Sequence, residues 1–210
     1  MDLVELFAIP VYCSNLNIAD KDVNCVMEQD YRRSKAQNGF LTINKRLLNI
    51  PQLKNLKKQI NKHIQIFMYE KLKVEPKIKF KITNSWALKH VKGDYTHPHN
   101  HANSLISGVM YLKTIENEKG GALTFHKNSS WHNIFPLSFN AEFTEHNFTT
   151  CDRFTIGPKP GAIILFPSSL NHSVAANQSD KIRCSVAFNI YVDGDIGLKD
   201  NTDEIRIKST

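Results

Sequence analysis

The part of the chain after residue 77 breaks into short β-rich runs, and this pattern limits the fold more than any other feature. The runs are separated by Gly, Pro, Asn and Asp, and no stretch with helical periodicity lies between them. Such a pattern is typical of an antiparallel β-sandwich or β-barrel. The predicted strands comprise residues 78–83, 85–91, 104–113, 122–126, 153–156, 162–166 and 183–192.

The N-terminal part has a different pattern. Residues 3–12 are apolar and include a proline, which favours an edge strand or an extended arm, and residues 20–35 show a weak helical pattern. Residues 51–72 carry apolar side chains at three- and four-residue steps, and we expect this helix to pack on the outside of a sheet. The same stripe would also suit an interface with another subunit. We therefore expect one domain, with residues 1–76 forming an arm and supporting helices and residues 77–210 forming the β core.

Composition and charge limit the classes of protein to which this chain can belong. A chain of 210 residues with 41% hydrophobic content can bury one sizeable core. The net charge of +7 would attract nucleic acid, a membrane surface or a small acidic ligand, but the basic residues are scattered and we do not expect nucleic acid to be the partner. No apolar run approaches the roughly 20 residues that cross a bilayer. Cysteines without CxxC spacing and an N-terminus without a signal-peptide pattern predict a cytoplasmic protein with reduced thiols.

Three histidines occur within five residues, at His97, His99 and His101. In extended backbone, residues two apart point the same way, so His99 and His101 can converge on one metal ion. His172 follows the predicted strand 162–166 and a loop that would expose it at a barrel mouth, which makes it the natural third ligand. On ligand type alone this set suits Fe(II), Zn(II), Cu(II) or Ni(II). The sequence suggests no comparable role for the other histidines: His63, His90, His126, His132 and His146.

The predicted strand 183–192 alternates between a polar face that begins with Arg183 and Ser185 and an apolar face. Periodicity alone does not decide whether the polar face lies in the barrel or in solvent. Near a metal, a guanidinium and a hydroxyl are suited to hold the far end of a chelating dicarboxylate. Tyr111 can add a phenol to this group, although an aromatic residue that only fills the barrel is the simpler explanation.

Several short motifs also follow one another in a characteristic order. The motifs are TNSW (83–86), HNH (99–101), SGVMYL (107–112), GGALTF (120–125), PGAIILFP (160–167), NH (171–172) and RCSVAFN (183–189). Their order and spacing resemble the 2-oxoglutarate- and Fe(II)-dependent oxygenases, especially a short group common in phage and marine bacterial genomes. The resemblance implies a double-stranded β-helix, that is, a mainly β, cupin-like jelly roll, with the N-terminal helices packed outside.

The resemblance also implies roles for individual residues. His99 would be the first metal ligand and His172 the distal one. Arg183 would hold the far carboxylate of 2-oxoglutarate, with help from Ser185 and Tyr111. The chain departs from the broader family's HxD/E motif, because it carries His101 where that motif has a carboxylate.

The activity implied by the resemblance is a dioxygenase that uses Fe(II), 2-oxoglutarate and dioxygen. It would hydroxylate an unidentified substrate and release succinate and CO2. Two alternatives stay open, a cupin-like metal-binding protein and a zinc-dependent hydrolase built on the three-histidine site. Substrate contacts are expected from residues 127–152 and from the loops between strands. The sequence does not determine the oligomeric state.

Overall fold

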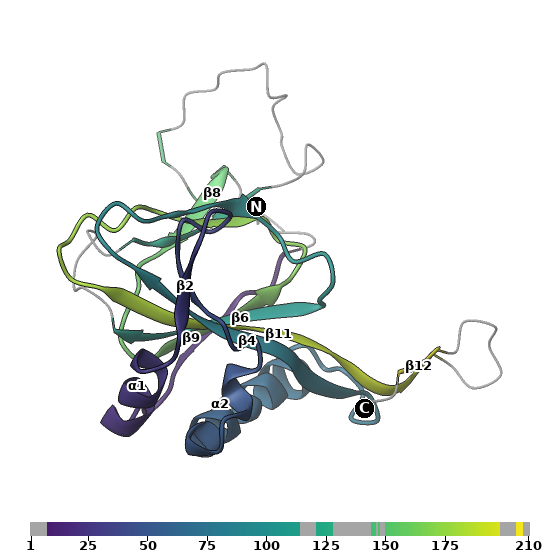
Figure 1. Cartoon of the computed structure of the whole chain (residues 1–210). Helices are drawn as coiled ribbons and strands as arrows, with labels where there is room; N and C mark the ends of the chain where they lie inside the picture. Colours follow the sequence, from purple (N-terminus) through teal and green to yellow (C-terminus); the bar gives the residue numbers. More distant parts are fainter. Residues whose placement is uncertain are drawn as a thin grey trace.

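Two facing antiparallel β-sheets make up most of the molecule, with two helices beneath the larger sheet (Figure 1). The computed structural model describes residues 8–113, 121–127, 144–145, 147, 150–197 and 205–207. The strands of the larger sheet are β1 (Tyr12–Asn15), β2 (Tyr31–Ser34), β3 (Gly39–Thr42), β4 (Lys79–His90), β6 (Ile106–Lys113), β9 (Ala162–Pro167), β11 (Arg183–Ile196) and β12 (Ile205–Ile207). The smaller sheet contains β5 (Thr96–His99), β7 (Leu123–His126), β8 (Arg153–Ile156) and β10 (His172–Val174).

The strand order places β11 at the centre of the larger sheet. The order is β1-β9-β6-β11-β4-β3-β2, with β12 paired to β11, and the smaller sheet runs β5-β10-β7-β8. Strands far apart in sequence are therefore neighbours, as in a jelly roll, and the predicted fold class is confirmed. Most of the predicted excursion at residues 127–152 lies outside the described residues, as do His132 and His146.

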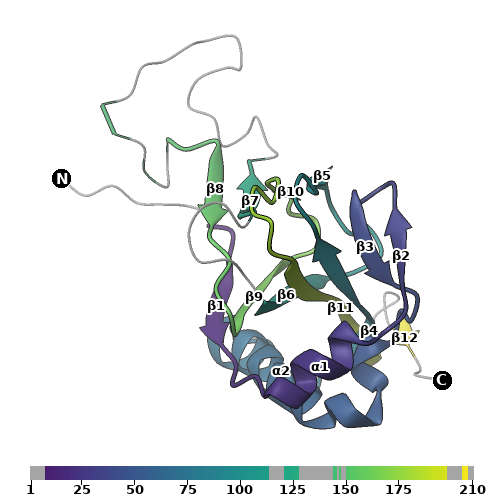
Figure 2. The ribbon, with the colours of Figure 1, turned by 60° about the vertical axis from the view of Figure 1, so that its left-hand side comes forward.

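The helices cover the outer face of the larger sheet (Figure 2). They are α1 (Asp20–Met27) and α2 (Lys54–Gln65), and short helical turns precede and follow α2 at η1 (Leu47–Asn49), η2 (Pro51–Leu53) and η3 (Ile66–Lys71). The apolar stripe of α2 is buried in one cluster with side chains of β4, β6, β9 and β11. Burial of each large apolar side chain contributes about 1.5–3 kcal/mol, so this packing stabilises α2 more than intrinsic helix propensity does. The stripe predicted within residues 51–72 thus packs within the monomer.

The structure differs from the sequence prediction in four respects. The runs 78–83 and 85–91 form one strand, β4, because the interruption between them is a bulge: Ile82 and Asn84 pair with consecutive residues of β11. The weak helix predicted over residues 20–35 ends at Met27, and its second half is strand β2, which gains backbone hydrogen bonds by pairing with β3. The short strands β5 and β10 were not predicted. Residues 8–11 form no strand, and β1 begins at Tyr12.

The two faces of strand β11 have different surroundings. Cys184, Val186 and Phe188 point into the core between the larger sheet and the helices. Arg183 and Ser185 alternate with them and line a cavity between the two sheets. The polar face of this strand, which periodicity could not orient, therefore lies inside the molecule.

Gly108 on β6 provides a test of this packing. A Cβ at this position would lie 2.3 Å from the Phe188 ring and 2.8 Å from a Leu165 methyl group. We expect Gly108→Ala to lower the free energy of unfolding by about 1–3 kcal/mol, because the added methyl group would force the packed side chains of Phe188 and Leu165 to shift. Urea unfolding measures the change. Gly157→Ala is the matched control, since a Cβ there meets nothing within 4 Å, and equal effects of the two substitutions would contradict the packing.

Candidate metal centre

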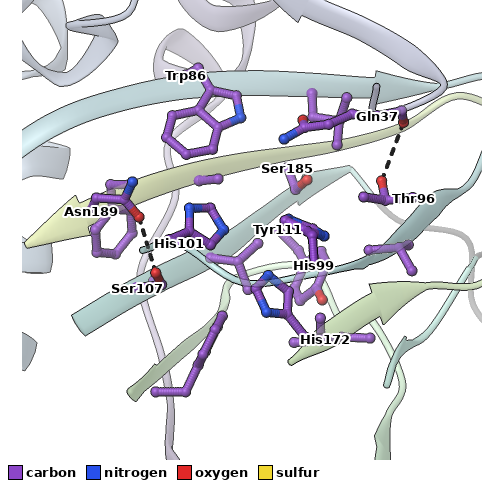
Figure 3. A pocket seen from close by; sticks show the side chains of 18 of the residues that line it. Gln37, Trp86, Thr96, His99, His101, Ser107, Tyr111, His172, Ser185 and Asn189 are labelled. Carbon is purple, nitrogen blue, oxygen red and sulfur yellow. Dashed lines mark hydrogen bonds between the residues drawn. The ribbon is translucent and has the colours of Figure 1, made fainter. Parts of the chain in front are cut away.

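Three imidazoles converge between the two sheets. His99 ends β5 and His172 begins β10, and the two residues are direct cross-strand partners. His101 follows two residues after His99, and its backbone N–H donates a 2.9 Å hydrogen bond to the Ser168 carbonyl. One ring nitrogen from each histidine lies within 4.8 Å of the others (Figure 3). The structure thus brings together all three predicted ligands.

Hydrogen bonds to backbone carbonyls orient two of the rings. The Nδ1 atom of His99 lies 2.8 Å from the His97 carbonyl, and that of His172 lies 2.9 Å from the Leu170 carbonyl. A carbonyl only accepts, so each Nδ1 carries a hydrogen, and in the neutral form of each ring the lone pair on Nε2 is left for an ion. His97 contributes its carbonyl, while its exposed ring stands edge-on to Tyr95 at 4.8 Å.

The rings are held in the form that binds metal. Burial lowers the pKa of His101 to about 4, and the neighbouring His99 adds to this effect. Burial also lowers the pKa of His172 to about 4, against the raising effect of its bond to the Leu170 carbonyl. Both rings are therefore neutral at pH 7. In the described part of the chain the group contains no carboxylate, so an ion here would meet neutral nitrogen donors, a set that suits Fe, Zn, Cu and Ni.

A cavity adjoins the three histidines. Its empty space, which includes the solvent at the open mouth, is about 530 Å³. Arg183, Ser185 and Tyr111 line it, and Ser185 and Tyr111 are cross-strand partners. The three residues predicted to bind a cosubstrate therefore share one cavity with the three predicted metal ligands.

Arg183 is a buried cation that lacks an anionic partner in the described part of the chain. Its side chain is 1% exposed, and no acidic residue in the described ranges forms an ion pair with it. Its NH1 atom lies 3.1 Å from Nδ1 of His90, its Cζ lies 5.0 Å from the centre of the Tyr111 ring, and its Nε has no partner. The Tyr111 hydroxyl is also buried, without a hydrogen-bond partner among the residues that the structure describes. Because a buried unpaired charge is costly, this arrangement fits an anionic ligand in the cavity.

Other cavity residues were missed by sequence reasoning. Ser107 donates to Asn189 at 3.0 Å and lies 2.8 Å from the Ser168 hydroxyl. Trp86 stacks on His101 with ring centres 5.9 Å apart, and its buried Nε1 has no partner. Figure 3 shows Trp86 and Asn189 beside His101. The alternation of β11 places Asn189 on the same face as Arg183 and could have revealed it, whereas nothing local in the sequence marks His90.

A sequence comparison decides the family. The model of a family described as "Putative 2OG-Fe(II) oxygenase" matches residues 84–189, just over half of the chain. The chain belongs to this family. It is therefore an oxidoreductase of the class that uses Fe(II) and 2-oxoglutarate, and the predicted cofactors are confirmed at the level of the family. No curated protein matches the chain in sequence.

Several solved structures share the fold at low sequence identity. HygX from Streptomyces hygroscopicus, solved with nickel, 2-oxoglutarate and hygromycin B, is 10% identical with a TM-score of 0.61, covering 87% of this chain and 82% of that one. A Pseudomonas putida prolyl-4-hydroxylase is 11% identical with a TM-score of 0.56, covering 88% and 94%. The viral collagen prolyl hydroxylase of Paramecium Bursaria Chlorella virus-1 is 15% identical with a TM-score of 0.54, covering 86% and 94%. In the described part of this oxygenase, no helix is long and apolar enough to span a membrane.

Buried neutral histidines make the stability of the metal-free protein depend on pH. Burial, followed by the charge of Arg183, lowers the pKa of His90 from 6.5 to about 4. As the pH falls, His90 therefore binds a proton in the unfolded chain before it does so in the folded protein. The contribution of the neutral ring to the free energy of unfolding is fully present above pH 6.5 and falls as the pH drops towards 4. For His90 alone we expect a loss of about 3 kcal/mol. Urea unfolding at several pH values measures this loss. If the free energy of unfolding depends on pH in the same way in His90→Asn as in wild type, His90 is not the group responsible.

Proposed function

We propose that this protein is a 2-oxoglutarate- and Fe(II)-dependent dioxygenase that hydroxylates a substrate and releases succinate and CO2. His99, His101 and His172 would hold the iron, and His101 would replace the usual carboxylate in full. Arg183, with Ser185 and Tyr111, would bind the distal carboxylate of 2-oxoglutarate. One observation carries the proposal: a buried guanidinium, without an anionic partner among the described residues, lines the same cavity as three imidazoles.

The charges of the site are consistent with this ligand. The three imidazoles bring no negative charge, so a divalent ion keeps both of its positive charges and Arg183 adds a third. A dianionic cosubstrate would meet a cation at each end. Binding would also place an acceptor beside the two buried groups that lack one, Nε of Arg183 and the Tyr111 hydroxyl.

The bound iron and 2-oxoglutarate would supply dioxygen activation, with decarboxylation of the cosubstrate to succinate. The protein contributes orientation and exclusion of water. His99 and His172 are held in one tautomer by backbone carbonyls, so their Nε2 atoms need no reorganisation when the ion binds. Phe166 and Leu123 provide apolar walls beside the cluster, which strengthens the pairing of Arg183 with a carboxylate.

Turnover of 2-oxoglutarate tests the proposal. Metal-free protein is supplied with 2-oxoglutarate and either Fe(II) or Zn(II), in air and without oxygen, and succinate is measured. We expect succinate only when Fe(II) and oxygen are both present. Succinate that forms equally well with Zn(II) or without oxygen would contradict the dioxygenase and favour a hydrolytic or cupin-like protein.

A further inference from the structure

His90 is buried at the end of β4, directly beside Arg183. The two residues are cross-strand partners, and His90 is 0% exposed. Its Nδ1 lies 3.1 Å from NH1 of Arg183, and its Nε2 lies 3.3 Å from the Thr96 hydroxyl. The ring therefore links the guanidinium to the smaller sheet through β5.

These contacts fix the protonation of the ring. A guanidinium only donates hydrogen bonds, so Nδ1 of His90 must accept and carries no hydrogen. The Thr96 hydroxyl donates to the Gln37 carbonyl at 3.3 Å, which leaves it to accept from Nε2–H of His90. The geometry thus selects one species, a neutral imidazole with its hydrogen on Nε2.

The space around the ring allows little rotation. A Cβ on Gly39 of β3 would lie 2.6 Å from Cδ2 of His90, so the absence of a side chain at Gly39 makes room for the imidazole. The carbonyl of His90 accepts a 3.0 Å hydrogen bond from the Asn177 amide. His90 is therefore a rigid acceptor at a fixed distance from Arg183.

The remaining charges near His90 are paired with each other. Asp94 accepts two hydrogen bonds from Arg33, at 2.6 and 3.0 Å, and a third from the Val91 N–H at 3.0 Å. Arg183 and Arg33 lower the pKa of His90, while Asp94 raises it, but burial is the largest effect. The Asp94 carboxylate is thus paired with Arg33 and does not form an ion pair with Arg183.

A neutral acceptor beside Arg183 has a consequence that a carboxylate would not have. A carboxylate would orient the guanidinium but would also neutralise it, and would compete with an anionic ligand. A neutral imidazole orients the guanidinium and leaves its full charge for the ligand. We propose that His90 is a positioning residue that holds Arg183 through its unprotonated Nδ1 so that the guanidinium meets the distal carboxylate of 2-oxoglutarate. This inference rests on the proposed function.

Three substitutions separate this role from simple core packing. His90→Asn keeps a neutral acceptor near the position of Nδ1, His90→Leu removes the acceptor, and His90→Asp supplies an acceptor that neutralises Arg183. Calorimetric titration of 2-oxoglutarate into the Fe(II)-loaded variants without oxygen gives the affinities. We expect His90→Asn to bind within a few-fold of wild type, and both His90→Leu and His90→Asp to bind about 10- to 100-fold more weakly.

Two further measurements test the proposed role of His90. The Fe(II) affinity should be unchanged in all three variants, because His90 is outside the three-histidine cluster. Nitrogen NMR of the wild-type protein should show His90 with its hydrogen on Nε2, which requires no variant to fold. Unchanged binding in His90→Leu, equal affinities of His90→Asp and His90→Asn, or a hydrogen on Nδ1 would overturn the inference. A wild-type protein that binds iron but not 2-oxoglutarate would instead overturn the proposed function, and the inference with it.

Discussion

Replacing Arg183 with leucine should weaken 2-oxoglutarate binding by roughly two to three orders of magnitude and leave Fe(II) binding almost unchanged. The guanidinium is the one buried cation in the described lining of the cavity. Its loss would leave a carboxylate buried without a partner, which costs about 3–5 kcal/mol. Titration of the Fe(II)-loaded protein without oxygen measures the change.

Two further arginine substitutions sharpen this test. Arg183→Lys keeps the charge but loses the planar fork, so we expect an affinity between those of wild type and Arg183→Leu. Arg153→Leu is the matched control, because Arg153 is exposed on β8 and paired with Asp152. A loss of affinity of the same size in Arg153→Leu would show that general charge, and not the buried guanidinium, attracts the cosubstrate.

Replacing His172 with alanine should lower the Fe(II) affinity by roughly two orders of magnitude or more. Loss of an outer partner of a metal ligand already costs about 10- to 100-fold, and loss of the ligand itself should cost at least as much. His97→Ala is the control, because it removes an exposed ring but keeps the carbonyl that orients His99. Competition with a chromophoric chelator gives both affinities, and equal affinities in the two variants would exclude His172 as a ligand.

Substitutions of His101 test whether it fills the position of the usual carboxylate. His101→Asp should retain Fe(II), because a carboxylate there restores the common ligand set, whereas His101→Ala should lose most of the affinity. If His101→Ala binds iron as tightly as wild type, the third ligand lies elsewhere.

The outline of the fold could be predicted because the long strands carry strong local signals. Strands β6, β9 and β11 alternate or are continuously apolar, and α2 carries a clear stripe. Strands β5 and β10 could not be predicted, because they have four and three residues, and each contains a single β-branched residue beside its histidines. Their pairing brings His172 opposite His99, a contact between distant segments that leaves no local trace in the sequence.

For the same reason, only some residues of the candidate site could be predicted. The HNH spacing and the motif order predicted the histidines, and the alternation of β11 placed Arg183 and Ser185 on one face. Which way that face points depends on the helices that cover the other side of the sheet. His90 could not be predicted, because its role arises only from its cross-strand pairing with Arg183.

Anaerobic titration of the metal-free protein with Fe(II) and 2-oxoglutarate tests the central claim most directly, because an iron chelate of 2-oxoglutarate has a visible charge-transfer band. We predict that the band saturates at one equivalent of iron and is lost in His172→Ala and, at the same cosubstrate concentration, in Arg183→Leu. Tight binding of iron without a band, or a band that persists in both variants, would contradict the account.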